Sequence, residues 1–299
     1  MSKQKTTLFR GTATALITPF ADGRIDFDAF GRLIERQLSA GIDALVVSGT
    51  TGECATLSDP EKMALFAFAA ERIGGRVPLI AGVGCADTAH TLTLCRSATA
   101  AGADALLIVT PYYNRPSQAG LRAHFECVAD ASEKPIIVYS VPGRTGVTVS
   151  IDTYEALADH PNIVAVKEAC TDMGAISALI DSCSDRLDVY AGNDDLTVPM
   201  LALGGVGVIS VLSNIIPGAV RDVTRLWWEG KPRLSSAKSA KYRCLSRALF
   251  ADTNPVPVKC ALGMMGLCRE EYRLPLTSPC EDVRRRLELC LKELKLIEN

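Results

Sequence analysis

A repeated strand–helix pattern is the feature that most limits how this chain can fold. Short apolar runs alternate with longer stretches that have helical periodicity, and the phrase at 40–47 (AGIDALVV) returns almost unchanged at 101–108 (AGADALLI). In both copies a glycine ends a helix and a buried strand follows. Such alternation is typical of βαβ units, in which helices cover parallel strands.

Eight strands can be placed with this pattern. They are residues 12–20, 42–47, 77–83, 103–108, 135–141, 163–169, 187–192 and 206–210. Residues suited to N-capping precede the intervening helices, among them Asp26, Ser58, Asp87, Ser117, Ser150 and Asp172. Eight β/α units predict an α/β fold of the (β/α)₈ TIM barrel type. A doubly wound open sheet is the alternative, but no G-x-G-x-x-G follows the first strand.

The composition changes after Gly230. Basic residues become frequent, no strand signal follows, and residues 281–299 carry apolar side chains at helical spacing. We therefore expect a catalytic barrel over residues 1–230 and an all-helical extension over residues 231–299. The basic run is more typical of a solvated helix face than of a binding patch.

The overall composition restricts the functional class. Hydrophobic residues make up 48% of the 299 residues and the net charge is −2, which indicates a full globular core and no nucleic-acid footprint. The 11 cysteines are scattered without a C-x-x-C pair, so we expect reduced thiols and a cytoplasmic location. Three widely spaced histidines disfavour a zinc site, and we expect no metal and no cofactor. No apolar run is long enough to span a membrane.

Lys167 ends the buried run that begins at Ile163. Burying an ammonium is costly unless it is paired or loses its proton. A lysine that has lost its proton is a nucleophile for carbonyl carbons. The alternative is a lysine with a buried stem and a solvated head.

Other polar groups follow the neighbouring predicted strands. In a parallel barrel these ends meet on one face, which is where the active site lies. The groups are the turn Gly49-Thr50-Thr51-Gly52-Glu53, the paired Tyr112 and Tyr113, Tyr139 with Arg144, the strand end at Gly192, and Ile209-Ser210. An amine, hydroxyl proton carriers, an arginine and an anion-binding turn suit carbon–carbon chemistry through a lysine Schiff base with a keto acid.

These motifs also resemble a known family. The turn at 49–53, the run at 112–118 (YYNRPSQ), Tyr139 with 141–146 (VPGRTG) and Lys167-Glu168 are similar to the dihydrodipicolinate synthase family. That family belongs to the pyruvate-dependent class I aldolase and N-acetylneuraminate lyase superfamily. The resemblance extends from about Gly11 to the run at 254–259 (NPVPVK).

The resemblance implies a function and a set of roles. A member condenses pyruvate with L-aspartate 4-semialdehyde, the first committed step of the diaminopimelate and lysine pathway. It is a cytoplasmic homotetramer, a dimer of dimers. Lys167 would form the Schiff base, and Tyr139, Thr50 and Tyr113 would relay protons, with Tyr113 supplied by a neighbouring subunit. The substrates would be held by Thr51, Ile209, Gly192 and Arg144, of which Arg144 would grip the carboxylate of the aldehyde.

Two other interpretations remain open at this stage. A sibling of the superfamily would cleave a keto-deoxy sugar acid or N-acetylneuraminate to pyruvate. A barrel without catalytic activity would bind a keto acid as a sensor. The Pro-x-Arg-Thr-Gly setting of Arg144 and the pair Thr50-Thr51 favour the synthase. Ser140 stands where many synthases have asparagine.

A further expectation concerns feedback by L-lysine. The resemblance places the effector site at Cys54, Asp59, Ala86, His90 and Tyr112. A histidine in place of a carboxylate and an alanine in place of an amide remove partners for a cation, and Lys62 adds a like charge. Losing a charge-assisted bond typically costs about 1.5–3 kcal/mol, so we expect weak or absent inhibition.

Overall fold

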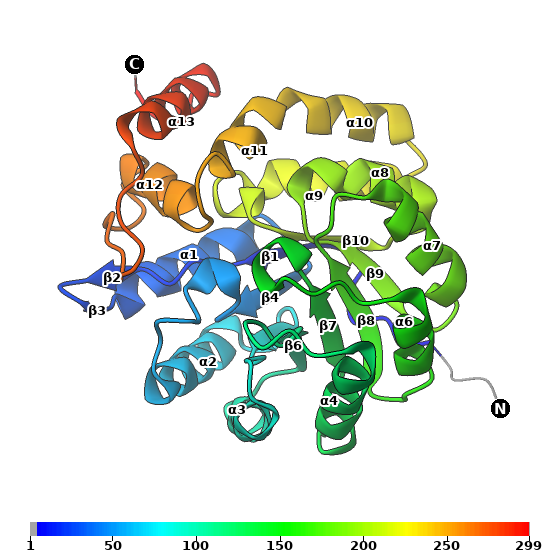
Figure 1. Ribbon diagram of the computed structural model, residues 1–299. Helices are drawn as coiled ribbons and strands as arrows, with labels where there is room; N and C mark the ends of the chain where they lie inside the picture. The colour runs from blue at the N-terminus through cyan, green and yellow to red at the C-terminus, as the bar shows by residue number, and fades with distance from the viewer. Residues whose placement is uncertain (1–4, 299) are drawn as a thin grey trace.

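The computed structural model describes residues 5–298, and its centre is a closed barrel of parallel strands. Hydrogen bonding runs in the order β1-β10-β9-β8-β7-β6-β5-β4, and β1 pairs with β4 to close the ring. The strands are β1 (Gly11–Ala15), β4 (Ala44–Val47), β5 (Leu79–Gly82), β6 (Ala105–Val109), β7 (Ile136–Ser140), β8 (Ile163–Glu168), β9 (Asp188–Ala191) and β10 (Gly207–Ser210). Figure 1 shows them enclosed by helices. The predicted (β/α)₈ barrel is confirmed.

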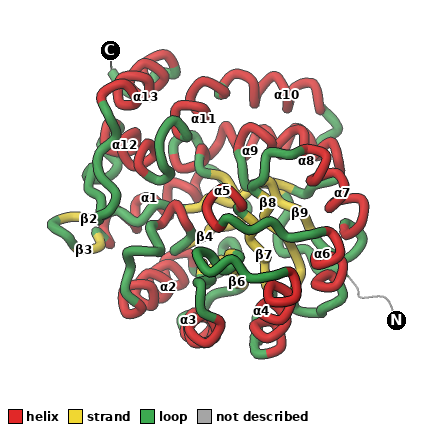
Figure 2. The backbone as a smooth tube through the Cα atoms, in the orientation of Figure 1, coloured by secondary structure: helices red, strands yellow, loops and turns green. Residues whose placement is uncertain are grey.

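Helices follow the strands around the outside of the barrel, as the red segments of Figure 2 show. They are α1 (Phe27–Ser39), α2 (Asp59–Ile73), α3 (Thr88–Ala100), α4 (Gln118–Asp130), α5 (Pro142–Thr145), α6 (Ile151–Ala158), α7 (Met173–Cys183), α8 (Thr197–Leu203) and α9 (Pro217–Trp228). Four more helices complete the chain: α10 (Pro232–Lys241), α11 (Arg243–Leu249), α12 (Val256–Met264) and α13 (Glu281–Glu293). Short 3₁₀ turns lie at η1 (Thr50–Gly52), η2 (Asp194–Leu196) and η3 (Leu212–Asn214).

Side-chain caps fix where the barrel helices begin, as the sequence predicts. Ser58 and Glu61 form a capping box at the start of α2. Asp26, Asp87, Ser117, Ser150 and Asp172 each accept a backbone N–H bond at the start of α1, α3, α4, α6 and α7. Each cap satisfies donors that a helix start would otherwise leave unpaired.

Two apolar layers hold the barrel. The outer layer lies between strands and helices, and the inner layer fills the barrel with side chains such as Ala13, Val46 and Ile137. Phe9 and Tyr190 stack within the inner layer with centroids 4.3 Å apart, and the Tyr190 hydroxyl donates to the Phe9 carbonyl at 2.7 Å. The interior is therefore a packed core, and polar groups are left for the carboxyl ends of the strands.

One sequence expectation, the length of the first strand, needs correction. The first strand was expected over residues 12–20, but β1 ends at Ala15, and the small hairpin of β2 (Phe20–Ala21) and β3 (Arg24–Ile25) follows. Residues 16–20 stay buried although they lie beyond the strand. Over residues 231–298 the extension has helices as its only regular elements, as expected, and a segment without helix joins α12 to α13 between Met264 and Glu281. Two prolines in that segment oppose a continuous helix.

Candidate active site

Lys167 lies between two tyrosines of the neighbouring strands. It is paired in register with Tyr139 on β7 and with Tyr190 on β9. Its side chain is buried, and its Nζ lies 4.3 Å from the centroid of the Tyr139 ring. The lysine therefore has a buried amine beside a phenol, which is the arrangement that the sequence predicted.

Burial lowers the pKa of Lys167 to about 8. The negative charge of Asp194 opposes this shift, and the positive charge of Arg144 adds to it. A sizeable fraction of the amine is neutral near pH 8 and able to attack a carbonyl carbon.

Tyr139 is tied to the turn that follows β4. Burial raises the pKa of the Tyr139 phenol, while a hydrogen bond with Thr50 and the charge of Arg144 oppose that rise. Thr50 and Thr51 belong to the 3₁₀ turn η1, in which Thr51 is buried. The structure therefore brings Lys167, Tyr139 and Thr50 together from three strand ends.

Asn254 connects two of the predicted binding residues. Its side-chain amide donates to the Thr51 hydroxyl at 3.0 Å, and its backbone carbonyl accepts from the Arg144 guanidinium at 2.8 Å. Sequence reasoning missed this role. The only available signal was the run at 254–259 at the end of the family resemblance, which does not show where Asn254 lies in space.

A fully buried ion pair fixes Glu53, the residue that follows the η1 turn. Lys259 of α12 donates to Glu53 at 2.6 Å, and both side chains have no exposed surface. The Lys259 ammonium also lies 4.1 Å from the centroid of the Phe20 ring. Glu53 has a left-handed backbone with φ of 55°, so this pair fixes a strained end of η1. The sequence analysis did not predict it.

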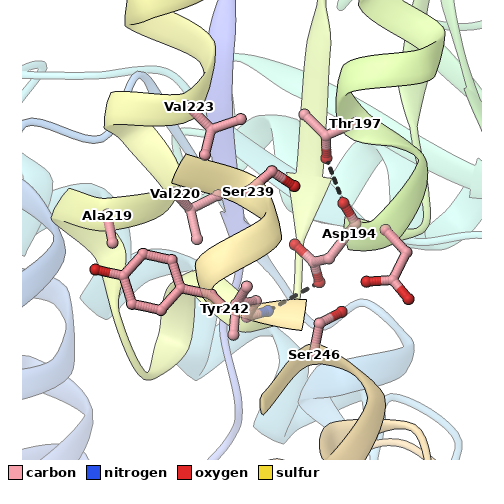
Figure 3. Close-up of a pocket in the computed structure, with 10 residues that line it drawn as sticks. Asp194, Thr197, Ala219, Val220, Val223, Ser239, Tyr242 and Ser246 are labelled. Atoms are coloured by element: carbon pink, nitrogen blue, oxygen red, sulfur yellow. Dashed lines mark hydrogen bonds between the residues drawn. The ribbon is translucent and has the colours of Figure 1, made fainter. Parts of the chain in front are cut away.

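Asp194 organises the end of β10 (Figure 3). Its carboxylate accepts from the Ser210 hydroxyl and from the backbone N–H groups of Val211 and Leu212, the latter at 2.9 Å. The Thr197 hydroxyl donates to the Asp194 carbonyl at 2.8 Å. A small hollow behind Asp194 is lined by side chains of α9 and α10 and by Tyr242 and Ser246. It lies outside the barrel, so we do not assign it to the substrates.

Gly192 directly follows β9, and Ile209 lies near the end of β10. The Gly192 N–H donates to the Glu168 carbonyl at 2.7 Å, and a Cβ on Gly192 would lie 2.7 Å from the Cβ of Ala169. Gly192 is thus required for close approach to the chain just beyond Lys167. Ile209 is buried in the inner layer and paired with Ala13.

Tyr113 is the predicted catalytic residue that one chain does not bring to the site. Its side chain is 96% exposed and its backbone is left-handed with φ of 72°. Tyr112 beside it is also exposed, although less so. Of the three hydroxyl residues predicted to relay protons, Thr50 and Tyr139 lie together in the single chain, joined by a hydrogen bond.

The predicted effector positions form a second cluster. His90 pairs with Asp59 at 2.8 Å, and the Lys62 ammonium lies 3.9 Å from the same carboxylate. The pKa of the Tyr112 phenol is raised by burial and by the charge of Cys54, and a hydrogen bond with the Ala86 backbone opposes the rise. The Asp59 carboxylate of this cluster is therefore already shared by His90 and Lys62.

No group of three or more His, Cys, Asp or Glu side chains within residues 5–298 could hold a metal ion. The same residues form no helix that is long and apolar enough to cross a membrane.

Comparison with known proteins identifies similar sequences and structures. The model of the dihydrodipicolinate synthetase family matches residues 8–294. Over 290 residues the chain is 44% identical to the 4-hydroxy-tetrahydrodipicolinate synthase of Geobacter sulfurreducens, covering 97% of this chain and 100% of that protein.

Solved structures agree with this similarity. The crystal structure of dihydrodipicolinate synthase from Thermotoga maritima superposes with a TM-score of 0.96 at 40% identity, covering 97% of this chain and all of the other. A monomeric variant of dihydrodipicolinate synthase also has a TM-score of 0.96 at 40% identity, covering 97% of this chain and 98% of that one.

Proposed function

The chain belongs to the dihydrodipicolinate synthetase family, and from that premise we propose that it condenses pyruvate with L-aspartate 4-semialdehyde, with Lys167 as the Schiff-base residue. It is a pyruvate-dependent enzyme of the lyase type. The observation that carries the proposal for the site is the buried Lys167 amine, which has a lowered pKa beside Tyr139. The product would be 4-hydroxy-tetrahydrodipicolinate, an early compound of the diaminopimelate and lysine pathway.

The sibling activity on keto-deoxy sugar acids is the weaker candidate. The full-length similarity to a named synthase and the family match both favour the condensation. A sensor without catalytic activity is disfavoured by the placement of Thr50, Tyr139 and Lys167 together, because binding alone does not require a proton relay.

The proposed reaction begins at Lys167. Its neutral amine attacks the ketone carbon of pyruvate, and loss of water gives an iminium. A methyl proton then leaves to form an enamine, whose carbon attacks the aldehyde of the second substrate. Tyr139 and Thr50 carry protons to and from these intermediates, and hydrolysis or displacement of the imine restores Lys167.

Binding groups surround that amine. Thr51 and the backbone around Ile209 hold the pyruvate carboxylate. Arg144 grips the carboxylate of the aldehyde, for which its guanidinium has donors beyond the one bonded to Asn254. Gly192 leaves room for the chain beyond Lys167 and keeps this end of the barrel compact.

The relay is completed by a second copy of the chain. The family resemblance assigns Tyr113 to the site of a neighbouring subunit, in a homotetramer built from two dimers. The near-complete exposure of Tyr113 in the single chain supports this assignment. The 11 free cysteines and the biosynthetic role suit a cytoplasmic enzyme.

Trapping with borohydride tests the Schiff base. The protein is incubated with pyruvate and borohydride, digested and analysed by mass spectrometry. A reduced pyruvyl adduct is expected on Lys167, while Lys259, which is also buried but paired with Glu53, serves as the internal control. Folded protein without an adduct at Lys167 would contradict the proposal.

Weak or absent inhibition by L-lysine is proposed from the effector cluster. His90 and Lys62 both face Asp59, so the Asp59 carboxylate is already shared by two side chains and is a poor partner for a bound cation. Millimolar L-lysine at subsaturating pyruvate should leave the rate nearly unchanged. The matched variant His90→Glu should gain sensitivity, and strong inhibition of the unmodified protein would refute the idea.

A further inference from the structure

Two cysteines of the C-terminal helices face each other. Cys244 near the start of α11 and Cys290 near the end of α13 have sulfur atoms 3.0 Å apart. Helices α11 and α13 pack side by side at the upper left of Figure 1. All the cysteines are free thiols, and no other two cysteines among residues 5–298 have sulfurs within hydrogen-bonding distance of each other. The two thiols therefore need only a small approach to reach disulfide distance.

The two thiols differ in access. Cys244 is exposed and Cys290 is buried. Burial, together with a hydrogen bond and the charge of Cys244, raises the pKa of Cys290 to about 12. An incoming reagent thus meets Cys244 first, and Cys290 stays protonated while Cys244 is a free thiol.

A basic hollow opens beside this pair. It is lined by Arg243 and Arg247 of α11 and by Arg286 of α13, together with the two cysteines. Helical spacing places Arg247 one turn from Cys244, and Arg286 one turn from Cys290. Glu293 is the acidic residue on the same lining. Three guanidiniums against one carboxylate favour the approach of an anionic reagent to this hollow, at whose edge Cys244 lies.

We propose that Cys244 and Cys290 are a redox modification site that takes an anionic small-molecule disulfide, such as glutathione disulfide, and closes to an intramolecular disulfide. The proposal is independent of the catalytic roles assigned above. The new bond would join α11 to α13 and enclose the segment that carries Asn254 and Lys259, the two residues that reach η1.

The chemistry consists of two exchanges. The Cys244 thiolate attacks one sulfur of the disulfide, a mixed disulfide forms, and the first thiolate leaves and takes up a proton. Cys290 then loses its proton and attacks the Cys244 sulfur, and the second small thiol leaves. Two protein thiols are oxidised and one small disulfide is reduced to two thiols, so electrons and protons balance. Once Cys244 is bonded, its contributions to the raised pKa of Cys290 are gone.

Mass mapping of the full chain tests the site. Reduced protein is exposed to glutathione disulfide, and the remaining thiols are alkylated. We expect a linked pair of peptides bearing Cys244 and Cys290, with two hydrogens lost and no glutathione retained. Cys127 and Cys280 are exposed and serve as internal controls that can only keep glutathione. Dithiothreitol should reverse the link.

Variants separate the steps. Cys290→Ala should keep glutathione on Cys244, because the resolving thiol is missing. Replacing Arg247 and Arg286 by Gln should slow the reaction with glutathione disulfide several-fold, while the rate with the neutral bis(2-hydroxyethyl) disulfide stays the same. The oxidised protein should also unfold several degrees higher than Cys244→Ser treated in the same way.

Three results would overturn the proposal. Glutathione that persists on Cys244 of the unmodified protein would show that Cys290 does not resolve it. Reaction at Cys127 and Cys280 with none at Cys244 would show that the hollow does not direct the anionic disulfide to Cys244. If the replacement of Arg247 and Arg286 slowed the reactions with charged and neutral disulfides equally, the arginines would not act by attracting an anionic disulfide.

Discussion

Two buried lysines in this chain have opposite surroundings. Lys259 is fully buried, bonded to Glu53 at 2.6 Å and placed over the Phe20 ring. Lys167 is buried at the end of β8, and within residues 5–298 no carboxylate lies within ion-pair distance of its amine. The nearest acidic influence is Asp194, whose oxygens already accept from Ser210 and from the backbone beyond it.

The difference shows that burial alone does not make a lysine reactive. Burial lowers the pKa of both amines, but the Glu53 charge and hydrogen bond oppose this at Lys259. Lys259 therefore has a charged partner that favours its ammonium and fixes the end of η1, whereas Lys167 lacks one and can lose its proton near pH 8. One lysine supports the site and the other carries out the chemistry.

Lys167→Met should separate activity from stability. Without the amine no Schiff base forms, and we expect activity to fall by at least about a thousandfold. Because an unpaired buried amine destabilises the fold, the variant should be as stable as the parent or more so. Steady-state assay and urea unfolding measure the two effects. A variant that is inactive because it is unfolded would remove the contrast.

Lys259→Met should show the opposite result. The change leaves the Glu53 carboxylate buried without its partner, and breaking one side of such a pair costs about 3–5 kcal/mol. The free energy of unfolding should fall by that amount, and pyruvate should still be trapped on Lys167 in the folded fraction. The double variant Glu53→Gln with Lys259→Met removes both charges and should recover much of the loss. If single and double variants were equally destabilised, the pair would not act as argued.

The sequence predicts the surroundings of Lys167 but not the ion pair of Lys259, and the reason is physical. Lys167 ends a β-branched run, and strand ends in a parallel barrel meet at one known face, so its neighbours could be expected. Lys259 also interrupts an apolar stretch, but its partner Glu53 is 206 residues away in the chain. Long-range pairing of that kind leaves no periodic signal.

The same limit applies to the fold and the rest of the site. Alternating apolar runs and N-caps predict the strands and helices, because both are local properties. They do not show that the chain leaves the barrel after Ala15 while residues 16–20 stay buried, nor that Asn254 contacts Thr51. Tyr113 was assigned from the family resemblance, since no pattern in one chain reveals a residue that acts in another.

The pH dependence of Schiff-base formation should follow Lys167. Only the neutral amine reacts, so the rate should rise about tenfold per pH unit at low pH and level off above a pH of about 8. Between pH about 8 and pH 10.5, the ordinary pKa of lysine, Lys167 is protonated in the unfolded chain but has lost its proton in the folded protein. Stability therefore gains from this group as pH rises through that window, and Lys167→Met should lose the gain. A rate that continued to rise to pH 10.5 would contradict the lowered pKa.

Asn254→Asp should give the smallest effect and the most selective one. The Asn254 amide donates to Thr51, which leaves the Thr51 proton free for the pyruvate carboxylate. An aspartate would accept that proton instead and add a negative charge, so the KM for pyruvate should rise about tenfold, equivalent to one lost hydrogen bond. The kcat should change far less. The Asn254 carbonyl still accepts from Arg144, so the KM for the aldehyde should hold.

Thr51→Val is the matched control for that change, because it removes the hydroxyl that Asn254 orients. The two substitutions should raise the KM for pyruvate by similar factors, and combining them should add little, since both act on one hydrogen bond. Additive effects would place Asn254 in a separate role. An equal rise in the KM of both substrates would mean that the aspartate also disturbs Arg144. The two contacts of Asn254, with Thr51 and with Arg144, would then depend on each other.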